Sequence, residues 1–481
     1  MTEQAIVEAT PAFETADVQQ ALRTARSVRL SYEPVDVLIT ELKDMQARSR
    51  DFLVPFDKLK AKMVEISTLG DDGIGSVYKM VLELSEVPEL GTVELSLYEH
   101  TLGQLCQLTT IDGKAGVPTQ YLKRLLANNS DRGFVALASV NVQELLSRRY
   151  GELHTRGKTG EAKAVLVRTF KFNDGFKCRA LCSDRYFPIK TLEMVTIALG
   201  LAGGAIKTDT EGKSAVQGAF VFDKHISVQK CSVGFTNPSY AYDLRNPDRG
   251  IIRAESITKS EEGGNPVFTY PGGATYTLGG NFKYPDSGPR QHLVFPACRI
   301  SNSETGGGSA VIQPMLFEGA CLNGMVFATE MRRTHIGSIM EEANDYESDT
   351  TKNKKMETVI SMMTDAMKQV FSMESFEENC KKFLKLKDVA LKSNVVKEVT
   401  EELLKAIPGG EGLLEDVLKS YEQFTSGIDS AFDVQRALTR VAQDQNYDKQ
   451  SALEELGGAL ASGEKKIADK FLAVTGAVGA R

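Results

Sequence analysis

The segment of residues 163–190 carries the side chains in this sequence that best suit binding of an unpaired nucleic-acid strand. Two β-rich runs flank Asn173-Asp174-Gly175. An Asp-Gly pair between such runs is typical of a two-residue hairpin turn, because both turn positions need positive φ. With Asp174 and Gly175 as the turn, the residues predicted to face each other are Asn173 and Phe176, Phe172 and Lys177, Phe170 and Arg179, and Arg168 and Leu181.

This pairing separates the hairpin side chains into two faces. The first face is predicted to carry Arg168, Phe170, Phe172, Lys177, Arg179 and Leu181. The second is predicted to carry Val167, Thr169, Cys178, Ala180 and Cys182 and to face the core. Aromatic rings stack on bases while cations pair with phosphates, so the first face suits single-stranded DNA or RNA. The alternative is a solvated sheet face with cross-strand cation–π pairs.

A glycine-rich loop, Ser301-Asn302-Ser303-Glu304-Thr305-Gly306-Gly307-Gly308-Ser309, is a second candidate site. Consecutive glycines let a ligand approach the backbone, and exposed N–H groups there can hold an anion. The residues of this candidate anion loop are Asn302, Glu304, Gly306, Gly307 and Gly308. The alternative is a tight connection between strands whose polar side chains satisfy its own backbone, since no lysine follows the glycines as in phosphate-binding loops.

No catalytic, metal or cofactor motif accompanies these segments. The sequence lacks a G-x-x-x-x-G-K-[ST] loop and an H-E-x-x-H pair, and its five histidines are far apart. A hydrolase that holds a divalent ion with Asp184, Asn302 and Glu304 is a third-ranked hypothesis, because no second carboxylate accompanies Glu304. We therefore expect a protein that is not an enzyme and needs no cofactor.

The helices and strands predicted along the chain indicate an α+β fold. We expect a twisted, mainly antiparallel sheet with packed helices, followed by an all-helical C-terminal region. We expect a flexible N-terminal segment with short helices at 1–50, a core domain at 51–340 and a helical region at 341–481. In the last region the apolar residues from Met356 to Phe371 recur at helical spacing. This stripe either belongs to the core or mediates self-association, and we predict a homo-oligomer through these helices.

Composition is that of a soluble globular chain, with 42% hydrophobic and 25% charged residues. No run of about 18 apolar residues and no secretory signal is present, and the seven cysteines are scattered, so a cytoplasmic location in a bacterial host is expected. The net charge of −7 conceals a basic middle. Residues 151–340 have a balance of +5, between flanks of −5 and −7, which is compatible with phosphate binding in the middle region.

Four segments together resemble a known family. They are RALCSDRY at 179–186, RISNSETGGG at 299–308, CLNGM at 321–325 and RRTHIG at 332–337. In this order they are similar to a phage- and plasmid-borne group of proteins that is catalogued as a domain of unknown function. The resemblance covers roughly residues 95–465 and implies a setting of phage or plasmid DNA metabolism. At the level of fold alone, the chain also resembles phage single-strand annealing proteins, which form rings or filaments on DNA.

We therefore expect a non-enzymatic binder of single-stranded nucleic acid that acts in replication or recombination. The sequence leaves open whether the protein also anneals complementary strands. Its predicted contact residues are Arg168, Phe170, Phe172, Lys177, Arg179 and Arg185, with Arg332, Arg333 and His335 as a second strip. The alternative is a structural or interaction protein of a mobile element, such as an assembly factor or a host-defence antagonist, that does not bind nucleic acid.

Overall fold

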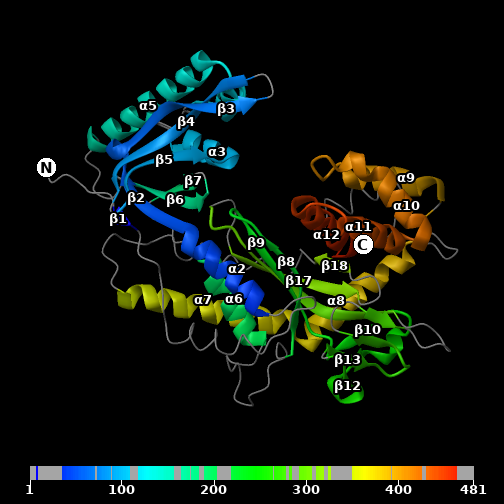
Figure 1. The fold of residues 1–481 in the computed structure, drawn as a ribbon. Coiled ribbons are helices and arrows are strands. Elements are labelled where there is room, and N and C mark those ends of the chain that lie inside the picture. Colours follow the sequence, from blue (N-terminus) through cyan, green and yellow to red (C-terminus); the bar gives the residue numbers. More distant parts are fainter. Residues whose placement is uncertain are drawn as a thin grey trace.

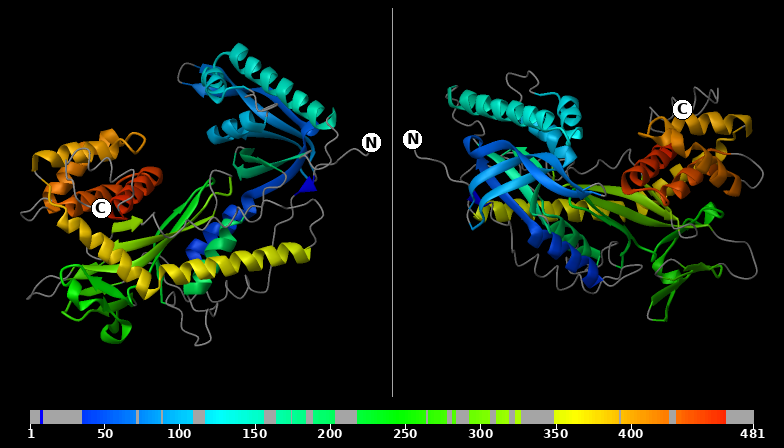
Figure 2. Two further views of the ribbon diagram at one scale, coloured as in Figure 1. Left: turned by 180° about the vertical axis from the view of Figure 1, so that it is seen from behind. Right: turned by 45° about the horizontal axis from the view of Figure 1, so that its top comes forward.

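The computed structural model shows an α+β protein with antiparallel sheets and an all-helical C-terminal region, which confirms the predicted fold class. Figures 1 and 2 show a first sheet and the C-terminal helices at opposite ends, with a second sheet between them. The described residues are 7–8, 35–70, 73–87, 89–108, 117–155, 164–173, 175–183, 189–202, 218–263, 265–277, 281–283, 292–305, 310–318, 323–326, 349–391, 393–424 and 430–462.

The first sheet has seven strands in the order β1-β2-β6-β7-β5-β4-β3. They are β1 (Val7–Glu8), β2 (Ser49–Pro55), β3 (Leu59–Gly70), β4 (Gly73–Val87), β5 (Gly91–Leu97), β6 (Ala164–Phe172) and β7 (Gly175–Ser183). All neighbours are antiparallel except β5 and β7. The helices α3 (Glu99–Leu108), α4 (Thr119–Ala127) and α5 (Arg132–Thr155) cover one face, and their apolar side chains share one core with the strands.

The β6–β7 hairpin forms where it was predicted, but its register differs. Phe172 pairs with Gly175 and Phe170 pairs with Lys177, a shift of two residues that preserves the faces of the tip. Gly175 has a φ of 119°, which favours glycine. β6 therefore ends at Phe172 and β7 begins at Gly175, each one residue earlier in the chain than the predicted Asp-Gly turn requires. The predicted pairing of Phe172 with Lys177 was wrong.

A β-bulge further along the hairpin moves the residues beyond it to the opposite face. Thr169 pairs with Cys178 and Arg168 with Ala180, which leaves Arg179 as the extra residue. Leu181 consequently packs with Cys178 in the core of the first sheet. Ala180 and Cys182 instead pack with Leu166 on the other side. The predictions that Leu181 lies on the binding face, and that Cys178, Ala180 and Cys182 share a face, were wrong.

The second sheet lies in the middle of the molecule and has the order β11-β10-β16-β17-β18, with β9 pairing both β16 and β8. Its strands are β8 (Phe220–Ile226), β9 (Cys231–Thr236), β10 (Ala241–Asp243), β11 (Ile251–Ile252), β16 (Leu293–Asn302), β17 (Val311–Glu318) and β18 (Asn323–Val326). A third sheet joins β12 (Thr258–Glu262), β13 (Asn265–Thr269), β14 (Thr275–Thr277) and β15 (Asn281–Lys283) in sequence order. The glycine-rich segment thus follows a central strand.

Three helices pack against the second sheet: α2 (Val35–Arg48), α6 (Thr191–Ala202) and α7 (Asp349–Val370). One hydrophobic core combines Val35 and Leu38 of α2 with Leu199 of α6 and Met363 of α7. This core therefore crosses both predicted domain boundaries, at residues 50 and 340. One of the short helices expected within residues 1–50 is present as α2.

The apolar stripe of α7 is part of this core. Val359, Met363 and Met367 have no exposed surface, and Phe371 has 1%. Their partners are α6 and the strands β16 and β17 of the same chain. The structure therefore does not support self-association through this stripe, because a buried side chain has no surface left to offer a second copy.

The C-terminal helices form a bundle that packs against the far end of the second sheet. They are α8 (Met373–Lys385), α9 (Ser393–Leu404), α10 (Leu414–Phe424), α11 (Ala431–Ala442) and α12 (Tyr447–Ser462). Their common core includes Val294 and Leu316 of the sheet. Ion pairs of Arg299 with Glu454 and of Arg436 with Glu318 (3.0 Å) join the strands to the bundle. None of the described helices has the length and apolar character needed to cross a bilayer.

Candidate nucleic-acid interface

Strand β6 carries Phe172, Phe170 and Arg168 on one side, from the hairpin tip inward. Burial increases in this order: Phe172 is half-buried, Phe170 is 3% exposed and Arg168 is 1% exposed. The face predicted to bind nucleic acid is therefore exposed only at its tip. Inside the molecule the same face meets α2, α6 and the end of β16 and becomes part of the interior.

The exposed part is a small aromatic and cationic surface, which we call the tip patch and define as Arg48, Tyr98, Phe172 and Lys177. The Lys177 ammonium nitrogen lies 4.5 Å from the centre of the Phe172 ring. The Arg48 guanidinium lies 5.9 Å from the same ring, and the Tyr98 and Phe172 ring centres are 6.2 Å apart. Phe170 supports the patch from beneath, with its ring 5.0 Å from that of Phe172 and 4.7 Å from the Arg48 guanidinium.

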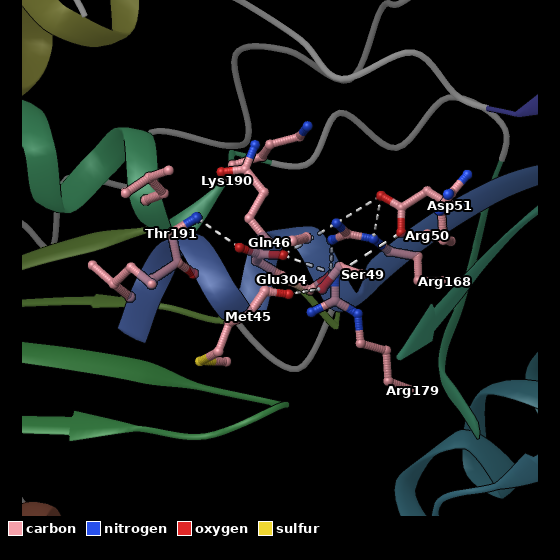
Figure 3. A pocket seen from close by; sticks show the side chains of 13 residues that line it. Met45, Gln46, Ser49, Arg50, Asp51, Arg168, Arg179, Lys190, Thr191 and Glu304 are labelled. Carbon is pink, nitrogen blue, oxygen red and sulfur yellow. Dashed lines mark hydrogen bonds and ion pairs between the residues drawn. The ribbon is translucent and has the colours of Figure 1, made fainter. Parts of the chain in front are cut away.

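The two arginines of the predicted interface, Arg168 and Arg179, bind carboxylates of the protein itself. Together with Asp51 and Glu304 they form what we call the charge cluster (Figure 3). Arg168 bonds Asp51 at 2.8 Å and Glu304 at 3.2 Å through Nη2. Arg179 Nη2 lies 2.9 Å from the same Glu304 oxygen. Because both guanidinium groups are buried and ion-paired, the prediction that they face solvent to pair phosphates was wrong.

Glu304 also holds the first turn of α6. Its second carboxylate oxygen accepts a hydrogen bond from the Thr191 backbone N–H at 2.6 Å, as expected of an acidic group at a helix N-terminus. Burial by itself would raise the pKa of Glu304, but Arg179, Arg168 and Thr191 outweigh it and lower the pKa to about 2. Glu304 is thus fully ionised and satisfied within the fold.

The described part of the glycine-rich loop also serves the protein's own backbone. The side chain of Asn302 is buried and donates to the Ile189 carbonyl at 2.7 Å. Ser303 and Thr305 both donate to the Gln229 carbonyl. As far as the described residues show, this agrees with the alternative of a loop that satisfies itself. Gly306, Gly307 and Gly308 lie outside the described residues.

Several predicted site residues cannot be placed, because they too lie outside the described residues. They are Arg185, Arg332, Arg333 and His335, together with Asp184 of the hydrolase hypothesis. Of the other residues in that hypothesis, Glu304 pairs with Arg168 and Arg179, and Asn302 donates to the Ile189 carbonyl. Among the described residues, no three His, Cys, Asp or Glu side chains are grouped as metal ligands.

Sequence reasoning missed Asp51, Arg48 and Lys190. Asp51 lies directly opposite Arg168 across β2 and β6, but 117 residues away along the chain. Arg48 ends α2 and reaches the Lys171 carbonyl at 3.0 Å, 123 residues away. No spacing within the chain marks such partners. An acidic residue in a strand that pairs with an arginine-bearing strand would be the signal, but the pairing of β2 with β6 had to be known first.

A pocket of about 340 Å³ lies beside the charge cluster (Figure 3). The end of α2 and the start of β2 form one wall, and Lys190, Thr191 and Leu192 at the start of α6 form another. Arg168, Arg179 and Glu304 form the rest of the lining. Arg48 of the tip patch immediately precedes the pocket residues Ser49 and Arg50.

Lys190 of the pocket wall and Glu193 in the first turn of α6 influence each other's pKa. Burial raises the pKa of Glu193 to about 8, with Lys190 acting against the shift and Glu304 adding to it. Burial lowers the pKa of Lys190, while Glu193, Asp51 and Glu304 oppose that change. At neutral pH Glu193 therefore mostly keeps its proton.

A comparison of the chain with protein-family models, curated proteins and solved structures found no match. The similarity of the four motif segments to the phage- and plasmid-borne family consequently remains a prediction. What the structure adds is that two of these segments meet, since Arg179 of the first binds Glu304 of the second.

Proposed function

We propose that this protein binds single-stranded nucleic acid, without catalysis, through the tip patch. The supporting observation is that the half-buried Phe172 ring lies between Lys177, Arg48 and Tyr98 at a hairpin tip. Single strands offer both bases to stack on such rings and phosphates to pair with such cations. The proposed interface is smaller than the sequence predicted, because Arg168 and Arg179 are excluded from it.

The setting that we propose is phage or plasmid DNA replication or recombination, in the cytoplasm of a bacterial host. It rests on the similarity of the motif segments to the phage- and plasmid-borne family. The small number of cations in the tip patch predicts a shallow salt dependence. With two phosphates neutralised by Arg48 and Lys177, the logarithm of the binding constant should fall with the logarithm of salt concentration at a slope of roughly −1.4.

Phe172→Ala is expected to weaken binding of a single-stranded oligonucleotide by about 1–3 kcal/mol, because one stacking ring is lost. Thermal stability should change little, since Phe172 is only half-buried. Tyr121→Ala is the matched control: it removes a 41% exposed aromatic side chain from α4. Fluorescence anisotropy at several salt concentrations measures the affinity. Equal affinity of Phe172→Ala and wild type, or no binding at low salt, contradicts the proposal.

A second candidate function, self-association as an interaction protein, is favoured by the outer face of α5. Phe134, Leu137 and Val140 are 43%, 45% and 65% exposed, and this helix lies at the outer surface of the first sheet (Figures 1 and 2). Their spacing of three residues places them on one helical face. The occupant that fits is a second copy of α5, packed antiparallel about Leu137. Phe134 then meets Val140 of the second copy.

Leu137→Cys tests this arrangement, because a residue on a twofold axis lies against itself. Mild oxidation is expected to give a disulfide-linked dimer of Leu137→Cys on non-reducing electrophoresis. Val37→Cys, which replaces a 45% exposed valine on α2, is the control and should stay monomeric. The six described native cysteines are buried and should not interfere. A monomeric wild type in light scattering at micromolar concentration, or equal cross-linking of both variants, removes this candidate.

A further inference from the structure

Three polar atoms in the lining of the pocket beside the charge cluster have no hydrogen-bond partner within the described part of the chain (Figure 3). They are Nε of Arg179, Oδ1 of Asp51 and Oε1 of Gln46. All three atoms are buried, and the side chain of Arg179 is 2% exposed. Nearly all buried polar groups of native proteins are hydrogen-bonded, since an unpaired one is unfavourable. The lining therefore offers hydrogen bonds that the protein itself does not use.

These atoms comprise one donor and two acceptors. The Asp51 carboxylate bonds Arg168 through Oδ2, whereas its Oδ1 lies 3.9 Å from Arg179 Nη2, which is too far for a hydrogen bond. A ligand that satisfies all three atoms needs two N–H donors and one acceptor. A phosphate or carboxylate group does not fit, because it would place its own oxygens against two acceptor oxygens. Arg168 and Arg179 are already ion-paired, so the ligand can be neutral.

We propose that this pocket binds a guanine base. The Watson–Crick edge of guanine carries the O6 acceptor and then the N1–H and amino donors, whereas adenine, cytosine and uracil each have only one donor group on that edge. Asp51 Oδ1 lies near the Arg179 guanidinium, so the adjacent O6 and N1–H groups of guanine fit this pair. The amino group then donates to Gln46 Oε1. Gln46 is thus the residue that would distinguish guanine from a base without the amino group.

The size and the remaining lining of the pocket suit a base. Its volume of about 340 Å³ lies at the lower end of the range of small-molecule sites, roughly 300–1,000 Å³. Leu42, Met45 and Leu192 supply apolar contact for the faces of the ring. A few polar groups at the edge of a planar ligand and apolar groups against its faces are the usual arrangement for reading a base outside a stack.

The guanine has two sources with the same chemistry: a free nucleoside or nucleotide, or a base of a bound strand. The second source rests on the proposed function. It is compatible with the fold because the tip patch and the pocket share the end of α2, where Arg48 belongs to the patch and Ser49 to the pocket lining. A strand lying across Phe172 would then turn one base into the pocket and prefer guanine at that position.

Calorimetric titration of the full-length chain with guanosine, inosine and adenosine tests the pocket directly. Inosine differs from guanosine only by lacking the amino group. Inosine and adenosine are expected to bind roughly tenfold or more weakly than guanosine, because each leaves a buried acceptor unpaired. Gln46→Met removes the acceptor at similar side-chain size and should bind guanosine and inosine equally. Gln120→Met makes the same change at an exposed position of α4 and should keep the preference for guanosine.

The comparison of nucleosides uses the wild-type protein, so it does not depend on how well a variant folds. Equal affinity of the wild type for guanosine and inosine overturns the proposal, and so does a preference for guanosine that a folded Gln46→Met protein retains. Melting curves confirm that each variant is folded. No binding of guanosine at millimolar concentration also overturns it and assigns the three atoms to ordered water.

Oligothymidylates with and without a single guanine separate the two sources and separate this proposal from the previous one. If guanosine binds and no oligonucleotide does, the pocket stands with a free nucleoside as its ligand and the strand interface falls. If both oligonucleotides bind equally and guanosine does not bind, the pocket proposal falls and the strand interface stands. If the guanine strengthens oligonucleotide binding in the wild type but not in Gln46→Met, the pocket receives a base of the strand and both proposals stand.

Discussion

Glu304→Gln is expected to lower the free energy of unfolding by about 3–5 kcal/mol, the usual cost of removing one partner from a buried ion pair. The side chain of Glu304 is 15% exposed and lies between Arg168 and Arg179, which are 1% and 2% exposed. Asp51 alone would then balance two buried guanidinium groups. The variant also loses the anion at the start of α6, where the Thr191 N–H donates to it.

Urea denaturation followed by circular dichroism measures this loss, with Glu398→Gln as the control because it makes the same change at an exposed position of α9. The pKa of about 2 fixes the pH dependence. A carboxyl group whose pKa is lowered by folding stabilises the native state above its ordinary pKa, and this contribution disappears as pH falls toward 2. The difference between wild type and Glu304→Gln should therefore shrink in acid. Equal stability at pH 7 would contradict the buried ion-pair geometry.

Glu193→Gln is expected to stabilise the protein at pH 8 and to flatten the dependence of its stability on pH. The side chain of Glu193 is 3% exposed, and burial raises its pKa to about 8. In the unfolded chain the carboxyl group releases its proton near pH 4.3. Between these values only the unfolded state is ionised, so wild-type stability should fall as pH rises from 5 to 8, by about 2–4 kcal/mol.

The groups that face Glu193 do not reproduce this slope. Glu304 ionises at lower pH, and the lowered pKa of Lys190 acts in the opposite direction at alkaline pH, where deprotonation of the folded state favours folding. Urea midpoints of wild type, Glu193→Gln and the Glu398→Gln control at pH 5, 6, 7 and 8 measure the effect. Parallel curves for all three proteins would show that Glu193 is ionised in the folded state at neutral pH.

The hairpin was predicted correctly, but its register and the faces beyond its bulge were not, and both outcomes have one physical reason. Local chemistry predicts a turn near Asn173, because turn residues act within a few positions of the chain. The bulge at Arg179 depends on how β7 meets β5 and how two arginines reach one carboxylate on another sheet. These are contacts between segments more than 70 residues apart, and no local pattern encodes them.

Local patterns along the chain are enough to predict the α+β class, the helical C-terminal region and the amphipathic character of α7 from residue periodicity, and the hairpin from its turn residues. What those faces contact follows from long-range packing, which no local pattern specifies. Val359 and Met363 cover the protein's own sheet, Arg168 and Arg179 bind Asp51 and Glu304, and the exposed apolar face belongs to α5. The physical reason is that an amphipathic helix must bury its apolar face, but its sequence does not specify against what. In the same way, the sequence around an arginine that pairs with a distant carboxylate does not differ from that around an arginine that binds a phosphate.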